Sequence, residues 1–217
     1  MFHLENEEDN MKIIDNYRDL PIGKYLEICE IDRRTDIEEL HKQVSILSIL
    51  SGMDEEEIYD LPIGEYKELA ARSRFLSHSY EGEILTAKTY ICGEWVLTPV
   101  EDYRKITTAQ YIDFQSFAKD AEKNIVEILS TMLIPKGKKY NQDYDIIELQ
   151  NALREYLSVA DALSLLAFFF VQYNQSIKDS LISSKEAAMK LRDPEKRKRV
   201  LKEIQKQEQH LKQLGVG

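Results

Sequence analysis

Apolar side chains recur every three or four positions along two long stretches of the chain, residues 106–134 and 145–182. This spacing places the apolar side chains of a helix on one face, where they can pack against other helices. The two stretches therefore predict a packed helical scaffold. The fold predicted for the whole chain is mainly α: a helical bundle with one small β-hairpin at about residues 85–99 and a basic C-terminal helix.

Signals for helix starts and ends divide this scaffold into elements. Thr107 and Gln110 have the spacing of a capping box, in which two side chains satisfy free N–H groups at a helix start. Pro135 is expected to stop a helix because proline lacks the N–H that the helix needs. With further start signals at Asp145, Ser158 and Pro194, the sequence predicts helices over 108–119, over 121–134, from 145, from 158 past 170, and over 194–214.

A smaller helical unit is predicted over residues 17–77. Its signals are two capping boxes, one glycine stop and two apolar helix faces. The capping boxes are Thr35 with Glu38 and Asp54 with Glu57, the stop is Gly52, one face consists of Ile37, Leu40, Val44 and Leu47, and the other, on a helix ending near Leu76, consists of Tyr66, Leu69, Ala70 and Ser73.

Residues 85–91 and 95–99 are rich in β-branched and aromatic side chains, and Gly93 with Glu94 is placed to turn the chain between them. This pattern predicts a β-hairpin. A two-stranded ribbon alone is barely stable in water. The hairpin is therefore expected to lie on the helices or to pair with another strand edge, either from this chain or from another one.

The sequence repeats itself in the predicted N-terminal unit. Asp19-Leu20-Pro21-Ile22-Gly23-Lys24-Tyr25 returns as Asp60-Leu61-Pro62-Ile63-Gly64-Glu65-Tyr66, with only the sixth position changed. Each copy has the features of a helix start, because proline fits the first turn and the isoleucine and tyrosine share a face. A chance resemblance of two helix starts explains six matches in seven poorly. A local duplication, or a pair of equivalent docking positions that includes Tyr25 and Tyr66, explains them better.

Two further groups of residues are candidates for partner contacts. Phe168, Phe169 and Phe170 are consecutive, so they spread around a helix turn, and the helix either is central in the bundle or touches a partner. The second group is a consecutive run of basic residues, Lys196, Arg197, Lys198 and Arg199, which point in all directions around a helix. A helix that binds a nucleic-acid groove instead has its basic side chains on one face. A solvated helix end is favoured over nucleic-acid binding, and contact with an acidic partner or a second copy is an alternative.

Composition narrows the class of protein. The chain has 39 acidic and 29 basic residues and a net charge of −10, which favours solubility and makes nucleic acid an unfavourable main partner. Cys29 and Cys92 are far apart, and no signal peptide or membrane span is expected, which suggests a reducing, cytoplasmic protein. The expected divisions are a mobile acidic segment 1–16, the helical unit 17–77, a linker with the hairpin 78–105, a helical domain 106–192 and the basic helix 193–217.

Motifs for chemistry fail on specific requirements. The four histidines have no zinc-ligand spacing. Residues 141–152 begin with Asn and Asp at alternate positions, as the ligands of a calcium loop do. They have Ile146 in place of the turn glycine and Ala152 in place of the bidentate glutamate. Residues 136–139 resemble a phosphate loop without its first glycine or its serine or threonine. We therefore expect no catalytic residue, no metal and no cofactor, and a protein that is not an enzyme.

Several stretches together resemble tail assembly chaperones and structural-module proteins of tailed bacteriophages that infect gut Bacteroides. They are VSILSILSGMDEEEIYDLPIGEYKEL, TYICGEWVLTPVEDYRKITTAQYIDF, LIPKGKKYNQDYDI and LSVADALSLLAFF, within about residues 37–182. The resemblance implies a factor that keeps a tape-measure or tail-tube protein soluble in the host cytoplasm. It leaves a permanent virion component as the alternative, because the first DLPIG copy and the basic tail depart from the pattern. A nucleic-acid-associated factor is a third hypothesis, and the implied partners are virion proteins or a second copy.

Overall fold

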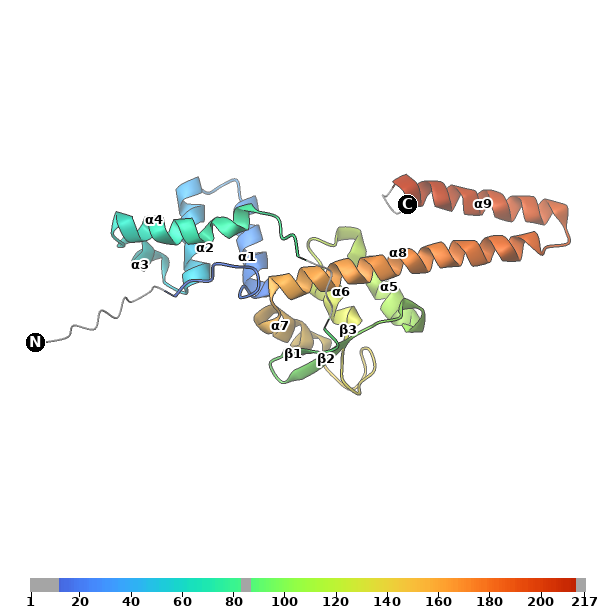
Figure 1. The fold of residues 1–217 in the computed structure, drawn as a ribbon, viewed down its shortest axis with the longest axis horizontal. Helices are drawn as coiled ribbons and strands as arrows, with labels where there is room; N and C mark the ends of the chain where they lie inside the picture. Colours follow the sequence, from blue (N-terminus) through green and yellow to red (C-terminus); the bar gives the residue numbers. More distant parts are fainter. Residues whose placement is uncertain (1–11, 83–86, 214–217) are drawn as a thin grey trace, which may run out of the picture.

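The computed structural model describes residues 12–82 and 87–213, and it confirms a mainly α fold with a small antiparallel sheet. The molecule is elongated, with α1–α4 at one end, the sheet and α5–α7 in the middle, and α8 and α9 extending to the other end (Figure 1). The helices are α1 Ile22–Arg33, α2 Glu39–Ser51, α3 Glu55–Tyr59, α4 Ile63–Arg72, α5 Thr108–Phe117, α6 Ile125–Met132, α7 Ile146–Tyr156, α8 Val159–Met189 and α9 Pro194–Gln213.

In the N-terminal unit, the second capping box is present and the first is not. Glu57 accepts a hydrogen bond from the Asp54 N–H at 2.8 Å, and Gly52 ends α2 in the left-handed region at φ 77°. The predicted box of Thr35 with Glu38 is wrong, because the backbone at Glu38 is extended and α2 begins one residue later. The carboxylate of Asp36 instead binds the Arg34 guanidinium, which belongs to the turn between α1 and α2.

The predicted apolar face of α2 is half right. Val44 and Leu47 are buried, but Leu40 is 55 % exposed, and Leu50 completes the buried face instead. The buried face therefore begins later in the helix than predicted, because the side chains of residues 39–41 are exposed. On α4, Leu69 is the buried residue of the predicted inward face, and Tyr66, Ala70 and Ser73 are half-buried.

A third strand, which the sequence reasoning assigned to a helix, completes the sheet. Strands β1 Tyr90–Cys92, β2 Trp95–Pro99 and β3 Leu133–Pro135 are antiparallel in the order β1-β2-β3. The helix predicted over 121–134 therefore ends at Met132, because the next residues pair with β2. The hairpin finds its partner edge within this chain. The first two residues of its first predicted strand, 85 and 86, lie outside the described residues.

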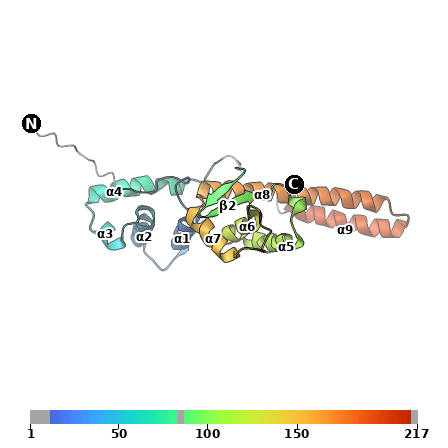
Figure 2. The ribbon, with the colours of Figure 1, turned by 90° about the horizontal axis from the view of Figure 1, so that it is seen from below.

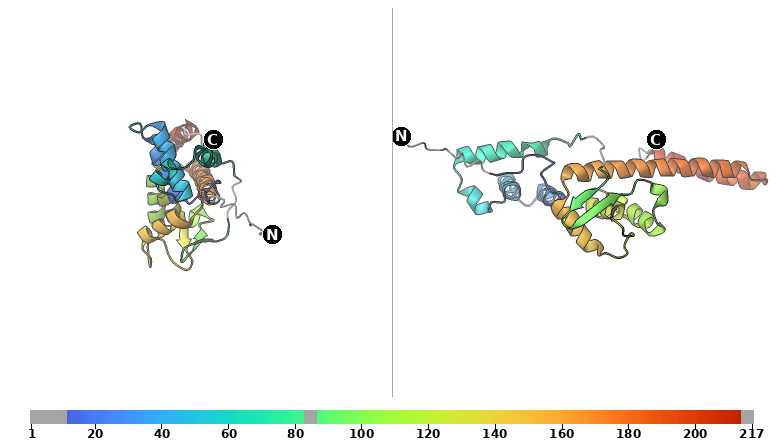
Figure 3. Two further views of the ribbon diagram at one scale, coloured as in Figure 1. Left: turned by 90° about the vertical axis from the view of Figure 1, so that its left-hand side faces the viewer. Right: turned by 60° about the horizontal axis from the view of Figure 1, so that its bottom comes forward.

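Helix α6 lies at the centre of the middle region. It packs against α5, α7 and α8, and seven of its eight residues are buried. The Gln110 side chain makes two contacts here: its oxygen accepts the Thr107 N–H at 3.0 Å, and its nitrogen donates to the Thr131 carbonyl at 3.0 Å. The predicted capping box thus also ties the start of α5 to the last turn of α6. Figure 3 shows the strands on the same side of α8 as α5 and α6.

Helices α8 and α9 form an antiparallel pair that extends beyond the middle region (Figure 2). Ser158 caps α8 by accepting the Asp161 N–H at 3.0 Å. Asp193 accepts the N–H groups of Glu195 and Lys196 at 2.9 and 3.2 Å, which confirms the predicted break and new start at this point. We call residues 189–199, which join the two helices, the α8–α9 tip.

Tyr103 carries a buried hydroxyl group that has no hydrogen-bond partner among the described residues. We expect Tyr103→Phe to raise the free energy of unfolding by about 1 kcal/mol, because it removes the desolvation cost of an unpaired polar group. The control is Tyr140→Phe, which loses a 2.7 Å bond to Asp113 and should be destabilising. Urea unfolding followed by circular dichroism measures both, and loss of stability in both variants would contradict the expectation.

Candidate protein-interaction surfaces

The first copy of the repeated motif is a buried internal contact. The Ile22 N–H donates to the Leu157 carbonyl at 2.8 Å, and the Val159 N–H donates to the Leu20 carbonyl at 2.8 Å. The side chains of Leu20 and Ile22 are fully buried. These contacts hold the start of α1 against the corner where α7 ends and α8 begins. The first copy therefore joins the N-terminal unit to the middle region.

Gly23 allows this close approach. A Cβ atom at Gly23 would lie 2.7 Å from the Arg154 carbonyl oxygen, and 3.1 Å from the Cβ of the same residue. Because the nearest of these atoms is backbone, the neighbour cannot move aside by changing a rotamer. The glycine of the first copy is thus required by packing against α7.

The second copy has the same local structure but no such neighbour. Pro62 precedes α4 as Pro21 precedes α1, yet Ile63 is 69 % exposed where Ile22 is fully buried. A Cβ at Gly64 would meet no atom within 4 Å. Within the described part of the chain, the Ile63 N–H has no hydrogen-bond acceptor. The two copies therefore do not have equivalent surroundings in the folded chain.

This difference predicts opposite effects for one substitution at the two glycines. Gly23→Ala should lower the free energy of unfolding by about 1–3 kcal/mol, because the new methyl group overlaps a carbonyl. Gly64→Ala should raise it by about 0.5–1 kcal/mol, because alanine loses less conformational entropy in a helix. Parallel urea unfolding curves of the two variants measure both signs. Destabilisation at both positions would contradict the assignment of an open second copy.

Tyr25 and Tyr66, the predicted docking tyrosines, are half-buried within the unit. Burial raises the pKa of Tyr25 to about 12, and its ring meets that of Tyr17 edge-on at 6.2 Å. The Tyr66 hydroxyl donates to the Gln43 side chain at 2.8 Å. Tyr25 lines a cavity of about 530 Å³ beside Cys29 and Gln43. Both tyrosines thus contact other parts of the N-terminal unit.

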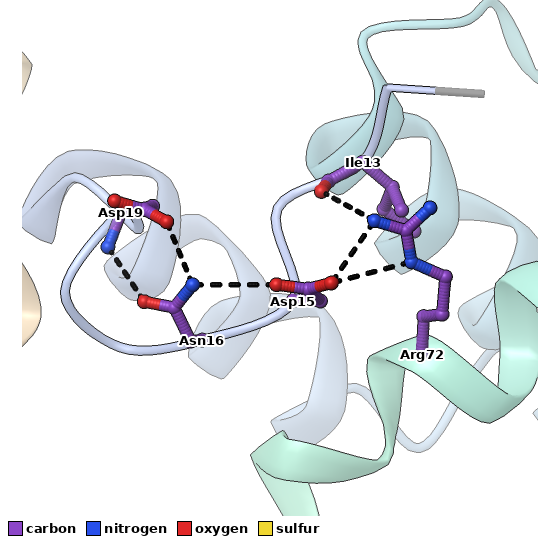
Figure 4. A network of polar contacts seen from close by, with 5 residues as sticks. All are labelled: Ile13, Asp15, Asn16, Asp19 and Arg72. Atoms are coloured by element: carbon purple, nitrogen blue, oxygen red, sulfur yellow. Dashed lines mark hydrogen bonds and ion pairs between the residues drawn. The ribbon is translucent and has the colours of Figure 1, made fainter. Parts of the chain in front are cut away.

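A polar network ties the chain before α1 to the end of α4 (Figure 4). Arg72 donates to the Asp15 carboxylate at 2.9 Å, and Asn16 donates to Asp15 and Asp19 at 3.3 and 2.7 Å. Ile13, just before the network, is buried. Residues 13–16, the end of the acidic segment 1–16 that was expected to be mobile, therefore make contacts with the folded unit. Residues 1–11 of that segment lie outside the described residues.

The network makes part of the stability depend on pH. Hydrogen bonding to Arg72, and then to Asn16, holds the pKa of Asp15 below its ordinary value. A lowered pKa in the folded state adds stability above the ordinary aspartate pKa, and that stability is lost as the pH falls through the folded-state value. The Asp15 side chain is 43 % exposed, so we expect less than about 1 kcal/mol. Asp15→Asn should therefore be less stable than wild type at about pH 7 and equal to it near pH 2 in urea unfolding. An equal gap at both pH values would contradict this.

Of the three consecutive phenylalanines, Phe169 is fully buried in the core, and Phe168 and Phe170 are half-buried against that core. The Phe170 ring lies 5.8 Å from that of Phe114 on α5. This part of α8 therefore packs against the core of the middle region. The Phe169 side chain is not exposed in this conformation, so a partner cannot contact it.

The four consecutive basic residues of α9 differ in their surroundings. The Arg197 guanidinium donates to the Leu191 carbonyl at 2.7 Å and is half-buried. Lys196, Lys198 and Arg199 are exposed. Arg197 thus stabilises the α8–α9 tip, while the other three provide positive charge to solvent.

The outer face of the sheet is an apolar surface that the sequence reasoning did not single out. Ile91 on β1 is paired directly with Val96 on β2, and their side chains are 75 % and 41 % exposed. Ile134 on β3 is half-buried on the same face, beside Thr98. The strand residues between them are buried. A signal was present, since Tyr90, Ile91 and Cys92 are all apolar and a strand can bury only alternate residues on one side.

The described residues include no group of three or more His, Cys, Asp or Glu side chains that could hold a metal ion. No described helix is both long and apolar enough to cross a bilayer. Burial raises the pKa of Cys92 to about 11 and also raises that of Cys29, so both thiols are protonated at neutral pH.

Comparison with known proteins adds no relative. The chain matches no protein-family model, no curated protein and no solved structure.

Proposed function

We propose that this protein is a tail assembly chaperone of a tailed bacteriophage, a non-catalytic factor that binds a tail protein in the host cytoplasm and keeps it soluble. The sequence resemblance supports the tail as the setting. The structural observation that carries the binding role is the apolar outer face of the sheet, where Ile91 and Val96 lie exposed side by side. A contiguous apolar surface on one face of a sheet can serve as a contact for another protein.

The sheet offers two ways of holding an unassembled client. Its outer face can cover an apolar helix or strand of the client, and β1 is an edge strand whose free backbone groups can add an extended segment. The net charge of −10 would keep a complex with an apolar client soluble. The client that fits the proposal is a tape-measure or tail-tube protein before assembly.

A permanent virion component is the second candidate. The observation that favours it is the α8–α9 pair, which extends beyond the rest of the molecule as an attachment arm would (Figure 2). Mass spectrometry of purified particles separates the two functions. A chaperone should be absent from finished particles, whereas a virion part should be present in fixed copy number.

Coexpression with the tape-measure or tail-tube protein tests the proposed chaperone role. Wild-type chain should increase the soluble fraction of one of these clients, and Ile91→Glu should abolish the increase. The matched control is Ile112→Glu on α5, since Ile112 is also exposed, at 58 %, and lies away from the sheet. Equal client solubility with and without the wild-type chain, or equal loss from both variants, would contradict the proposal.

A further inference from the structure

The start of α4 carries two features that the fold of the chain does not explain. Ile63 is 69 % exposed, and Gly64 faces open space in the first turn of a helix. Glycine at such a position costs about 0.5–1 kcal/mol relative to alanine. At the equivalent place on α1, the isoleucine is covered and the glycine admits a carbonyl of α7. Both features of α4 are accounted for if another polypeptide covers this surface as the α7–α8 corner covers α1.

The charge around this surface indicates the character of the polypeptide. Residues 54–68 contain seven carboxylates and a single basic residue, Lys67. None of these side chains has an ion-pair partner in the part of the chain that the structure describes. We call this region, α3 with the start of α4, the acidic end. A partner that fits it combines an apolar contact for Ile63 with positive charge.

The α8–α9 tip has these properties. Residues 189–199 contain six lysines and arginines against two acids, and Met189 is 62 % exposed. The tip is also a corner between two helices, as is the α7–α8 corner that binds the first copy of the motif. In the folded chain the tip and the acidic end lie at opposite ends of the long axis, so they cannot meet within one molecule (Figure 1).

We propose that the acidic end of one molecule binds the α8–α9 tip of a second copy. The two surfaces are different, so in a pair of bound molecules one keeps a free tip and the other keeps a free acidic end. Such a head-to-tail contact produces an open filament, or a ring if the rotation closes. This self-association does not depend on the proposed chaperone role and can be tested with the purified chain alone.

The proposed contact between copies differs from the contact that the start of α1 makes with the α7–α8 corner. At the α7–α8 corner, the Leu157 carbonyl accepts a backbone N–H, whereas at the tip the Leu191 carbonyl already accepts two bonds from Arg197. The contact between copies therefore rests on Ile63 with Met189 and on opposite charges. Attraction between exposed charges is screened by salt, so association should weaken as ionic strength rises.

Sedimentation velocity of the full-length chain tests the proposal with two single-surface variants. Ile63→Glu disables the acidic end, and Met189→Glu disables the tip; both residues are exposed, so both variants should fold as wild type does. Wild type at about 100 µM and about 50 mM salt should form a series of oligomers. Each variant alone should associate at least about tenfold more weakly. An equimolar mixture should form a 1:1 dimer and no larger species, because only one complementary pair of surfaces remains.

Four results would overturn the proposal. They are a monomeric wild type under these conditions, a variant that associates as wild type does, a mixture that contains no dimer, and oligomers that appear only when duplex DNA is added. The last result would assign the basic tip to nucleic acid. Circular dichroism and thermal unfolding of both variants show that a loss of association does not come from a loss of fold.

Discussion

Replacing Ile22 with alanine is expected to lower the free energy of unfolding by about 3 kcal/mol, whereas the same substitution at Ile63 should change it by less than about 0.5 kcal/mol. The two residues occupy the same position of the repeated motif, but Ile22 is fully buried and Ile63 is 69 % exposed. Removing the Ile22 side chain loses buried apolar area and leaves a cavity where α1 meets the α7–α8 corner. Guanidinium unfolding followed by circular dichroism measures both effects.

The pair of variants contains its own control, because both substitutions remove the same atoms from the same place in a helix. An equal loss of stability at the two positions would mean that the second copy is packed as the first is. In that case the start of α4 would not be an open surface, and the prediction for Gly64→Ala would fail with it.

Phe169→Ala should have the other large effect, a loss of about 3–5 kcal/mol of unfolding free energy. Phe169 is on α8 and is fully buried in the core. Truncation therefore creates a cavity that the surrounding helices can fill only in part. Unfolding by heat and by denaturant measures the change. A loss this large is about a fifth or more of the stability of a typical domain and should be visible as a markedly lower melting temperature.

Phe168→Ala is the matched control, since Phe168 is half-buried against the same core and should cost less than Phe169. Unchanged stability in the Phe169 variant would contradict the burial of this side chain in the core. A larger loss at Phe168 than at Phe169 would show that the helix is rotated relative to the structure described above.

Features that depend on neighbouring residues in the chain were predictable from the sequence. The capping box of Asp54 with Glu57, the glycine stop at Gly52 and the caps before α5, α7, α8 and α9 all involve partners within four residues. Each requires particular side chains at fixed spacing, so the pattern alone indicates the structure. The box at Thr35 failed because a matching spacing does not fix the backbone, and the chain there is extended.

Features that depend on distant residues were not predictable in the same way. The helical pattern of α6 continues into Leu133–Pro135, but these residues pair with β2, more than thirty positions earlier in the sequence. A run of apolar residues suits either a buried helix or a buried strand, and only the presence of a free edge on β2 decides between them. The exposed pair on the sheet face was missed for a different reason: Tyr90, Ile91 and Cys92 are all apolar, so the sequence does not show which side of the strand the fold covers.

The repeated motif shows this limit most clearly. Its two copies begin helices in the same way, as their sequences predict, with proline before the first turn. Their different surroundings depend on the α7–α8 corner, which is near the first copy only in the folded chain. Equal sequence thus gives equal local structure, whereas burial depends on what tertiary packing brings to the surface.

Hydrogen exchange at the isoleucine amide of each motif tests the central claim most directly. The claim is that the first copy is an internal contact and the second an open surface. The Ile22 N–H bonds to the Leu157 carbonyl at 2.8 Å, so its exchange should be slowed to a rate that approaches global unfolding. In dilute solution, where copies do not associate, the Ile63 N–H should exchange nearly as fast as an unstructured amide. Similar protection of the two amides under these conditions would contradict the claim.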